Sequence, residues 1–560
     1  MYFRKALFKL TFATLLLFPL SASAFIGGEN WDHEAAKAGV EPSYTLPILS
    51  IFTENGKVID QKETYINSEL QLKTIHLHNN QWGSKTDGIS MALGIKGRGN
   101  SSWANFDKKP YKLKFAKKQK LLGMPANKHF ALLPLVGCFS SYFSHPLGME
   151  IGRHLMKGWT PHMIPVEVEL NGQYIGLYIL TETVRIDKGR IEIAEQSDNN
   201  TDKEMIDGGY LVEIDNYTQE ENQIKLMEDP LTPLLISVDT PGKMNAVHKK
   251  YLTKQFSNIN KAIYSDDKLS RDWEELVDAE SYARHFVVQE IMNNYDAYNG
   301  SVKLHKDFGK PWTFGPLWDT GDFFDPYKED FTFNTTPYRK TWITQTYQFP
   351  RFVKLVQEVW REFREIDSSV WIDFLTEWNN SIKLAEAQNQ KVWKYHRGHD
   401  STERLNYTIR RLLQHIEWLD KVWGNGDLTH NVSVNIDGDG TATIGGHDYP
   451  DVEVFDGDNV VISMKPARGM CLHSLTVNGE DHLDSVNKGK LSLCDITEDA
   501  SIDVEFVKSY TVEGNTVVSY IPVEVYRISG TRIGKGTRIR LPESGVYIIK
   551  AGDSTDKIIL

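Results

Sequence analysis

The stretch FGPLWDTGDFFD, residues 314–325, places three carboxylates among aromatic side chains and is the first candidate for chemistry in this sequence. The carboxylates belong to Asp319, Asp322 and Asp325. Oxygen-rich clusters of this kind suit hard cations. The spacing lacks the Gly and Glu pattern of an EF-hand, so that form is excluded, while another calcium loop, another metal site and an acidic turn remain open.

Asp319-Thr320-Gly321 is also the tripeptide of aspartic proteases. Those enzymes need two carboxylates that share a proton, and therefore two such loops or a symmetric dimer. No second Asp-Thr-Gly or Asp-Ser-Gly occurs in the sequence. The protease interpretation is therefore disfavoured.

Two acidic segments, NNYDAYNGS and PLWDTGD, follow one another in the order that phosphoryl transfer requires, with Asp296 first and Asp319 second. In kinase chemistry an earlier loop Asp orients the substrate hydroxyl, and a later Asp binds the metal ion that bridges the nucleotide phosphates. Between them, KDFGK contains the kinase tripeptide Asp-Phe-Gly. It lies between two strand-like runs, so Asp307 and Gly309 are predicted to form a β-hairpin turn that leads to Asp319.

A Gly-x-Gly loop and a basic strand precede these segments. The loop contains Gly97, Arg98, Gly99 and Asn100, and its amides could approach phosphates. In the strand KKPYKLKF, alternation predicts one packed face and one face that carries ammonium groups. The packed face has Tyr111, Leu113 and Phe115, and the candidates for a phosphate contact are Lys109, Lys112 and Lys114. Each feature also has a structural explanation. Gly97 and Gly99 could form a hairpin turn, the lysines could form a solvated face, and Asp296 could cap a loop.

The elements that must position these residues fall into successive parts of the chain. Residues 46–212 read as short alternating segments broken by Gly turns and predict a β-rich half. Residues 249–424 have helical periods. Within ESYARHFVVQEIMNNY one predicted helical face contains Ala283, Phe286, Val287 and Ile291.

The C-terminal residues change in composition and predict two small β-modules. Residues 428–508 read as a small β-sandwich or bacterial repeat module. Residues 509–560 predict three or four strands with Gly turns, too few to form an enzyme core, and suggest an attachment or sorting role.

Length, charge and cysteines limit the class of protein. The 560 residues suit two to four domains, and residues 1–24 have the basic start, apolar run and small residues of an export signal. Removing the three basic residues of this signal changes the net charge from −12 to −15, which disfavours nucleic acid as a partner. No later stretch is apolar for the roughly 20 residues that a membrane-spanning helix needs. Of three cysteines, Cys138 stands alone, whereas Cys471 and Cys494 are close enough in sequence to pair after export.

Taken in order, these segments resemble the CotH (spore coat protein H) kinase family over residues 45–425. The resembling pieces are LPILSIFTENG, IKGRGNSSWANFDKKPYKLKF, LLGMPANKHFALL, VEVELNGQYIGLYILTETVRID, GGYLVEID and GPLWDTGD. The resemblance implies an α+β fold, an atypical protein-kinase-like bilobal fold with a β-rich N-lobe and a helical C-lobe, followed here by the small β-sandwich modules. It also implies that Asp296 is the catalytic-loop residue, that Asp319 is a metal ligand, that the basic strand at residues 108–114 lines the ATP site, and that Glu182 matches an acidic residue after the GLYIL strand.

Three residues, in two places, depart from the family pattern. Ser144 and His145 stand where the family usually shows Arg-Asn, and Gly321 stands where it usually has a second acidic residue, with Asp322 one place later. Metal binding could therefore be shifted, weakened or lost, so a pseudokinase stays open. The tail resembles the sorting domains of type IX secretion substrates in Bacteroidetes, which implies a contact with secretion machinery.

The hypothesis from the sequence is a secreted atypical protein kinase. It would use ATP with Mg²⁺ or Mn²⁺, held by Asp319 and Asp322, and would transfer the γ-phosphate to Ser or Thr of an exported or surface protein. The alternative is a catalytically inactive relative that serves as a surface or scaffold protein and binds glycan or protein.

Overall fold

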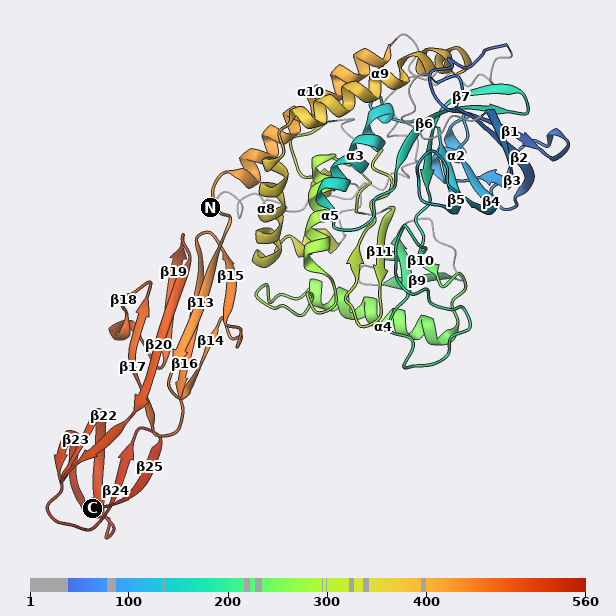
Figure 1. Ribbon diagram of the computed structural model, residues 1–560. Helices are drawn as coiled ribbons and strands as arrows, with labels where there is room; N and C mark the ends of the chain where they lie inside the picture. The colour runs from blue at the N-terminus through green and yellow to red at the C-terminus, as the bar shows by residue number, and fades with distance from the viewer. Residues whose placement is uncertain are drawn as a thin grey trace, which may run out of the picture.

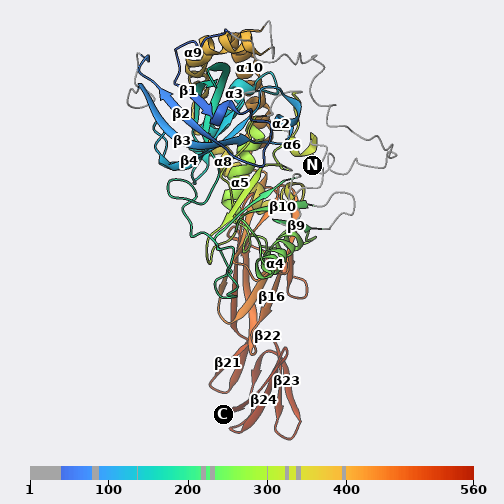
Figure 2. The same cartoon turned by 90° about the vertical axis from the view of Figure 1, so that its right-hand side faces the viewer.

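The computed structural model describes residues 39–77, 87–134, 136–215, 222–226, 234–294, 296–298, 300–321, 327–335, 342–393 and 399–560. They form a mixed α+β protein with a large N-terminal unit followed by two smaller β-units (Figure 1). Turning the molecule by 90° shows the same extended succession of units (Figure 2). The expected signal at residues 1–24 lies outside the described residues. None of the helices within the described ranges is long and apolar enough to cross a membrane.

Seven strands close into a barrel at the start of the N-terminal unit (Figure 1). Their order around the barrel is β1 (Ile48–Thr53), β2 (Ile66–Lys73), β3 (Asp87–Gly97), β4 (Tyr111–Gln119), β5 (Asn127–Leu133), β7 (Gln173–Glu182) and β6 (Met163–Leu170). Neighbours are antiparallel except for the parallel pair β1–β6, which closes the barrel. On β4 the residues alternate as the sequence predicts, with Leu113 in the barrel core and Lys114 on the outer surface.

A second sheet of five strands lies in the same unit. Its order is β12 (Thr313–Phe314), β11 (Val302–Lys306), β8 (Tyr210–Ile214), β10 (Leu234–Thr240) and β9 (Gln223–Leu226). Strands β11 and β12 form the hairpin that the sequence predicts. Its turn contains Asp307, whose carbonyl accepts a hydrogen bond from the Lys310 amide at 3.3 Å, and Gly309 with φ of 66°. Asp307 is thus a turn residue.

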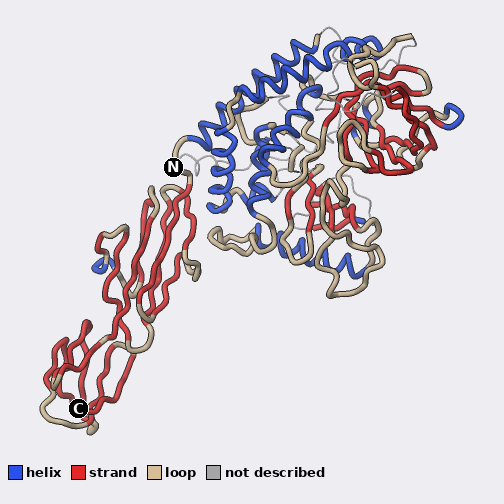
Figure 3. The backbone as a smooth tube through the Cα atoms, in the orientation of Figure 1, coloured by secondary structure: helices blue, strands red, loops and turns tan. Residues whose placement is uncertain are grey.

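The helices of the N-terminal unit lie beside the second sheet and beside the barrel (Figures 1 and 3). They are α2 (Ser101–Asn105), α3 (Ser141–Leu155), α4 (Ala246–Ile263), α5 (Ala279–Ile291), α6 (Thr332–Thr335), α7 (Trp342–Thr346), α8 (Pro350–Glu365), α9 (Ser369–Val392) and α10 (Ser401–Leu419). The sequence predicts one apolar face for α5, but every residue from Tyr282 to Ile291 is buried. The reason is that α3, α8, α10 and β12 all pack around it.

Helix α9 returns from the helical part to the barrel, where it contacts β7 (Figure 1). Asn389 Oδ1 accepts a hydrogen bond from the Leu177 amide at 3.1 Å, and Trp393 Nε1 donates to the Ile175 carbonyl at 2.8 Å. Gly176 lies between these two strand residues with φ of 104°, and a Cβ there would lie 2.2 Å from Asn389 Oδ1. A glycine is therefore required where the helix meets the barrel.

The first C-terminal β-unit contains two sheets around one core. Its strands are β13 (Thr429–Asp437), β14 (Gly440–Ile444), β15 (Asp451–Phe455), β16 (Asp458–Pro466), β17 (Met470–Val477), β18 (Glu480–Asp481), β19 (Lys490–Ile496) and β20 (Ala500–Lys508). The expected pairing of Cys471 with Cys494 is wrong, because both thiols are free. They lie in different sheets, Cys471 buried on β17 and Cys494 exposed on β19.

The last unit is one sheet of five strands with its own small core. Its strands are β21 (Tyr510–Glu513), β22 (Thr516–Arg527), β23 (Arg532–Arg540), β24 (Val546–Ala551) and β25 (Ser554–Ile559). The unit before it docks on the N-terminal unit through ion pairs that include Lys354–Glu453 at 2.7 Å and Arg271–Asp451 at 3.0 Å. The candidate site described below lies in the N-terminal unit.

Candidate active site

The glycine-rich loop connects the end of β3 to the short helix α2. A Cβ on Gly97 would lie 2.3 Å from the Trp103 ring, and Gly99 has φ of 79°. The Lys62 ammonium donates to the Gly99 carbonyl at 2.9 Å and to Asn100 Oδ1 at 3.3 Å. The contact with Trp103 therefore gives Gly97 a structural reason, and the positive φ gives Gly99 one.

Arg98 leaves the same loop toward the acidic segment at Asp319. Its guanidinium lies over the Trp318 ring, 5.5 Å from the ring centroid. Burial lowers the pKa of Arg98, and the carboxylates of Asp319 and Glu213 act in the opposite direction. Arg98 thus brings a positive charge from the barrel to the acidic residues of the helical part.

Asp296 and Asp319 lie on two loops that one hydrogen bond joins. Asp296 is exposed just after α5, and a Cβ on Gly300 would come within 2.9 Å of its Oδ2. Asp319 follows β12 with φ of 53°, and its carbonyl accepts a hydrogen bond from Asn294 Nδ2 at 3.1 Å. Asn294 stands two residues before Asp296, so one side chain joins the two acidic loops.

The three departures from the family pattern meet at one contact behind Asp319. Ser144 Oγ donates to the Gly321 carbonyl at 2.8 Å. The His145 ring covers Gly321, where a Cβ would lie 2.1 Å from its Nε2. That nitrogen is 3.8 Å from Asp319 Oδ1. Burial lowers the pKa of His145, which Asp319 opposes. The histidine therefore occupies the space that a side chain at position 321 would need.

The basic strand β4 presents Lys112 and Lys114 on the outside of the barrel. Burial, reinforced by the charges of Lys96 and Arg185, lowers the pKa of Lys112 to about 8. Lys114 is exposed beside the Tyr65 ring, at 5.8 Å from its centroid. Of these two lysines, Lys112 is therefore the one whose charged form an arriving anion would stabilise more.

Lys109 is turned away from this group. Its ammonium donates to the Trp103 carbonyl at 2.6 Å and lies 5.4 Å from the centroid of the Trp103 ring. The structure therefore places Lys109 against α2 rather than beside Lys112.

Glu182 ends β7 and is fully buried, with 0% of its side chain exposed. Its Oε2 accepts hydrogen bonds from the His162 amide at 3.0 Å and from His162 Nδ1 at 2.8 Å. Its Oε1 is buried without a hydrogen-bond partner among the described residues. Arg190 lies nearby and binds the His129 carbonyl at 2.7 Å. Glu182 thus binds the segment that leads into β6.

Three charged residues of the second sheet also face this region and are not identified from the sequence. The Lys303 ammonium lies 2.6 Å from Glu213 Oε2 and 2.9 Å from Asp239 Oδ2. Burial raises the pKa of Glu213 to about 7, which Lys303 opposes. The charges of Asp239 and Glu213 act on Lys112 and Arg98 of the barrel. Acidic groups of the second sheet therefore face basic groups of the barrel.

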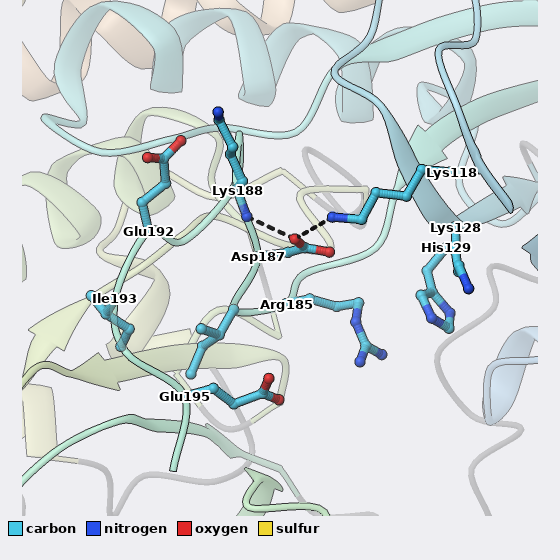
Figure 4. A pocket seen from close by; sticks show the side chains of 10 residues that line it. Lys118, Lys128, His129, Arg185, Asp187, Lys188, Glu192, Ile193 and Glu195 are labelled. Atoms are coloured by element: carbon cyan, nitrogen blue, oxygen red, sulfur yellow. Dashed lines mark hydrogen bonds and ion pairs between the residues drawn. The ribbon is translucent and has the colours of Figure 1, made fainter. Parts of the chain in front are cut away.

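A cavity of about 520 Å³ adjoins the basic group where the chain leaves the barrel (Figure 4). Asp187 is bound there by the Lys118 ammonium at 2.8 Å and by the Lys188 amide at 2.8 Å. Burial and the charges of Arg185 and Lys112 lower the pKa of His129 to about 4. Besides His129, the cavity is lined by four basic and three acidic side chains, namely Lys118, Lys128, Arg185, Lys188, Asp187, Glu192 and Glu195.

A divalent cation can be accommodated at Asp319. Its carboxylate is 55% exposed, and Asn294 keeps a buried Oδ1 without a hydrogen-bond partner in the described part of the chain. Asp322, the second predicted ligand, lies outside the described residues. Within the described ranges no three His, Cys, Asp or Glu side chains are grouped to hold a metal. Mg²⁺ is often held by one or two carboxylates together with phosphates and water, so Asp319 fits as one such ligand.

The sequence model of the CotH kinase protein family matches residues 95–421, more than half of the chain. The chain therefore belongs to the CotH kinase protein family. The match includes Arg98, Lys112, Asp296 and Asp319. No curated protein matches the chain. Membership indicates a kinase-like function, for which ATP and a divalent metal are the usual cofactors.

Proposed function

We propose that the chain is an exported atypical protein kinase that transfers the γ-phosphate of ATP to Ser or Thr of an exported or surface protein. The observation that carries the proposal is the hydrogen bond from Asn294 Nδ2 to the Asp319 carbonyl, which joins the two acidic loops. Phosphoryl transfer requires one carboxylate for the hydroxyl and another for the metal. The barrel and the helical part would then be the two lobes of a kinase-like fold, with ATP between them.

Each residue would have a separate task in this reaction. Asp296 would accept a hydrogen bond from the substrate hydroxyl and orient its oxygen toward the γ-phosphorus. Lys112 and Arg98 would face the phosphates. A Mg²⁺ or Mn²⁺ ion held by Asp319, and by Asp322 in the hypothesis, would supply charge neutralisation when bound. Positioning and electrostatic stabilisation account for most of the rate in this chemistry.

A catalytically inactive surface or scaffold protein that binds glycan or protein is the second candidate. It is favoured by the contact of His145 with Gly321, because the histidine fills the place of the second acidic residue. A single metal ligand would bind the cation more weakly. Aromatic residues make up 11% of the chain, which permits such a binding role but does not discriminate it from a packed core.

Asp319→Asn separates the two candidates. With Mg²⁺ or Mn²⁺ present, the wild-type protein is expected to incorporate labelled phosphate from ATP into itself or into added protein extracts. Incorporation should fall by at least about 10²-fold in Asp319→Asn, because the carboxylate charge is lost. Asp307→Asn, a hairpin-turn variant, is the matched control and should keep full incorporation. Absence of both incorporation and saturable ATP binding in the wild-type protein would support the inactive candidate.

The affinity for ATP is expected to fall by about fivefold between pH 7 and pH 9, because Lys112 loses its charge above a pKa of about 8. Lys112→Gln should bind ATP more weakly at pH 7 and should lack this pH step. Lys114→Gln is the matched control, since Lys114 lies on the same strand but is exposed. Titration of ATP at each pH, with Mg²⁺ held constant, measures the effect. An equal pH step in Lys112→Gln and wild type would contradict the role of Lys112.

Export is part of the same proposal. The signal-like residues 1–24 support it, and the tail at residues 509–560 supports a contact with secretion machinery through its resemblance to sorting domains. The tail folds as a separate sheet with its own core. Such a module suits recognition by secretion machinery independently of the N-terminal unit.

A further inference from the structure

Glu290 is a buried carboxylate next to the Asp296 loop that has no part in the mechanism above. It stands near the end of α5 with 0% of its surface exposed. Tyr298 donates its hydroxyl hydrogen to Glu290 Oε1 at 2.6 Å, and the Thr332 amide donates to Oε2 at 2.8 Å. A buried carboxylate is costly unless such bonds satisfy it, so its presence in this position needs an explanation.

The two bonds connect Glu290 to two segments that are separate along the chain. Tyr298 stands two residues after Asp296, in the turn closed by the Gly300 amide and the Asp296 carbonyl at 3.2 Å. Thr332 begins α6, which follows the Asp319 segment along the chain. The Glu290 backbone carbonyl is also bound to His415 Nε2 of α10 at 2.7 Å. One residue therefore holds the Asp296 loop, α6 and α10 in fixed relation.

We propose that Glu290 is a positioning residue for phosphate transfer. It holds the Asp296 loop through Tyr298 and holds α6 through Thr332. The inference rests on the proposed kinase function. The ionised carboxylate accepts from both donors in charge-assisted hydrogen bonds, which are roughly twice as strong as neutral ones. A protonated Glu290 would keep these contacts only as weaker neutral hydrogen bonds, because the charge is lost and the Tyr298 hydroxyl would have to accept.

Protonation of Glu290 is therefore expected to loosen the loop. Burial raises its pKa to about 7, which the bonds from Tyr298 and Thr332 oppose. The other titratable groups that face it are Tyr347, whose pKa is raised by burial, and His415, whose pKa burial lowers to about 4. These groups stay neutral near pH 7. Turnover should consequently decrease as the pH falls through about 7.

Tyr298→Phe tests the proposal because it removes one hydrogen bond and keeps the ring. We expect kcat to fall by about tenfold with KM for ATP changed less than twofold, and amide exchange of residues 296–298 to become faster. The matched control is Tyr251→Phe, since Tyr251 also donates to a carboxylate, Asp207, at 2.6 Å, but on α4. It should change neither kcat nor this exchange. Glu290→Gln should remove the decrease of kcat between pH 8 and pH 6.

The outcomes separate this inference from the proposed function. If the wild-type protein transfers phosphate and Tyr298→Phe leaves kcat and loop exchange unchanged, the inference fails and the kinase function stands. Equal losses in Tyr298→Phe and Tyr251→Phe would show general destabilisation and would overturn it as well. If the wild-type protein transfers no phosphate, the proposed function fails and the positioning role in transfer fails with it.

Discussion

Asp296→Asn is expected to lower the rate of phosphate transfer by about 10²- to 10⁴-fold while leaving the affinity for ATP within about twofold. The asparagine keeps the size of the side chain but loses the charge and one acceptor that would orient the substrate hydroxyl. Asp296 is exposed, and the loop is held by Asn294 and Tyr298 rather than by the Asp296 carboxylate alone. The substitution should therefore leave the fold intact.

Single-turnover transfer from labelled ATP, together with equilibrium ATP titration, measures the two effects separately. Asp307→Asn is again the control, because Asp307 belongs to the Asp-Phe-Gly tripeptide but forms the β11–β12 turn. Loss of ATP binding in Asp296→Asn would place this residue in the nucleotide site instead. Full transfer activity in the variant would contradict its assignment as the hydroxyl-orienting residue.

Arg404→Leu is expected to destabilise the N-terminal unit by about 3–5 kcal/mol. Arg404 is fully buried on α10, pairs with Glu386 of α9 and lies 4.1 Å from the centroid of the Tyr142 ring of α3. Removing the guanidinium would leave the Glu386 carboxylate buried and without its countercharge. The pair stands beside the contact of Asn389 with β7, so the loss should also weaken the attachment of α9 to the barrel.

Denaturant unfolding followed by tryptophan fluorescence measures this change. Arg361→Leu is the matched control, since Arg361 pairs with Asp427 but both side chains are more than half exposed, at 53% and 61%. Its effect should be within about 0.5 kcal/mol. The double variant Arg404→Leu with Glu386→Leu should recover part of the loss, because no unpaired charge remains. Equal effects of Arg404→Leu and Arg361→Leu would contradict the argument.

Local patterns in the sequence predict much of the fold. The β-rich first half, the helical second half, the outward lysines of β4 and the β11–β12 hairpin all follow from periods of two or 3.6 residues and from turn residues. The sequence pattern of α5 predicted only one buried face. The helix is buried on all sides, because α3, α8, α10 and β12 surround it. The cysteine pairing failed because closeness in sequence does not tell which sheet a strand joins.

The order of the acidic segments and the basic strand was sufficient to name Asp296, Asp319 and Lys112 as candidates and to recognise the family. A motif keeps its residues within a few positions of one another, so the sequence alone can show it. The same sequence also shows that Gly321 departs from the family pattern. It cannot show that His145 fills the space above this glycine.

Only the tertiary structure identifies the residues that bring the candidates together. Asn294 meets the Asp319 carbonyl, Lys303 meets Glu213 and Asp239, and Glu290 meets Thr332. Most of these partners are tens of residues apart, and their meeting depends on strand register and helix packing. A register shift of one residue would turn each of these strand side chains to the opposite face, and no local pattern specifies it. The sequence by itself therefore determined which groups are the candidates for the chemistry, and the packing of distant segments decided which groups hold these candidates in place.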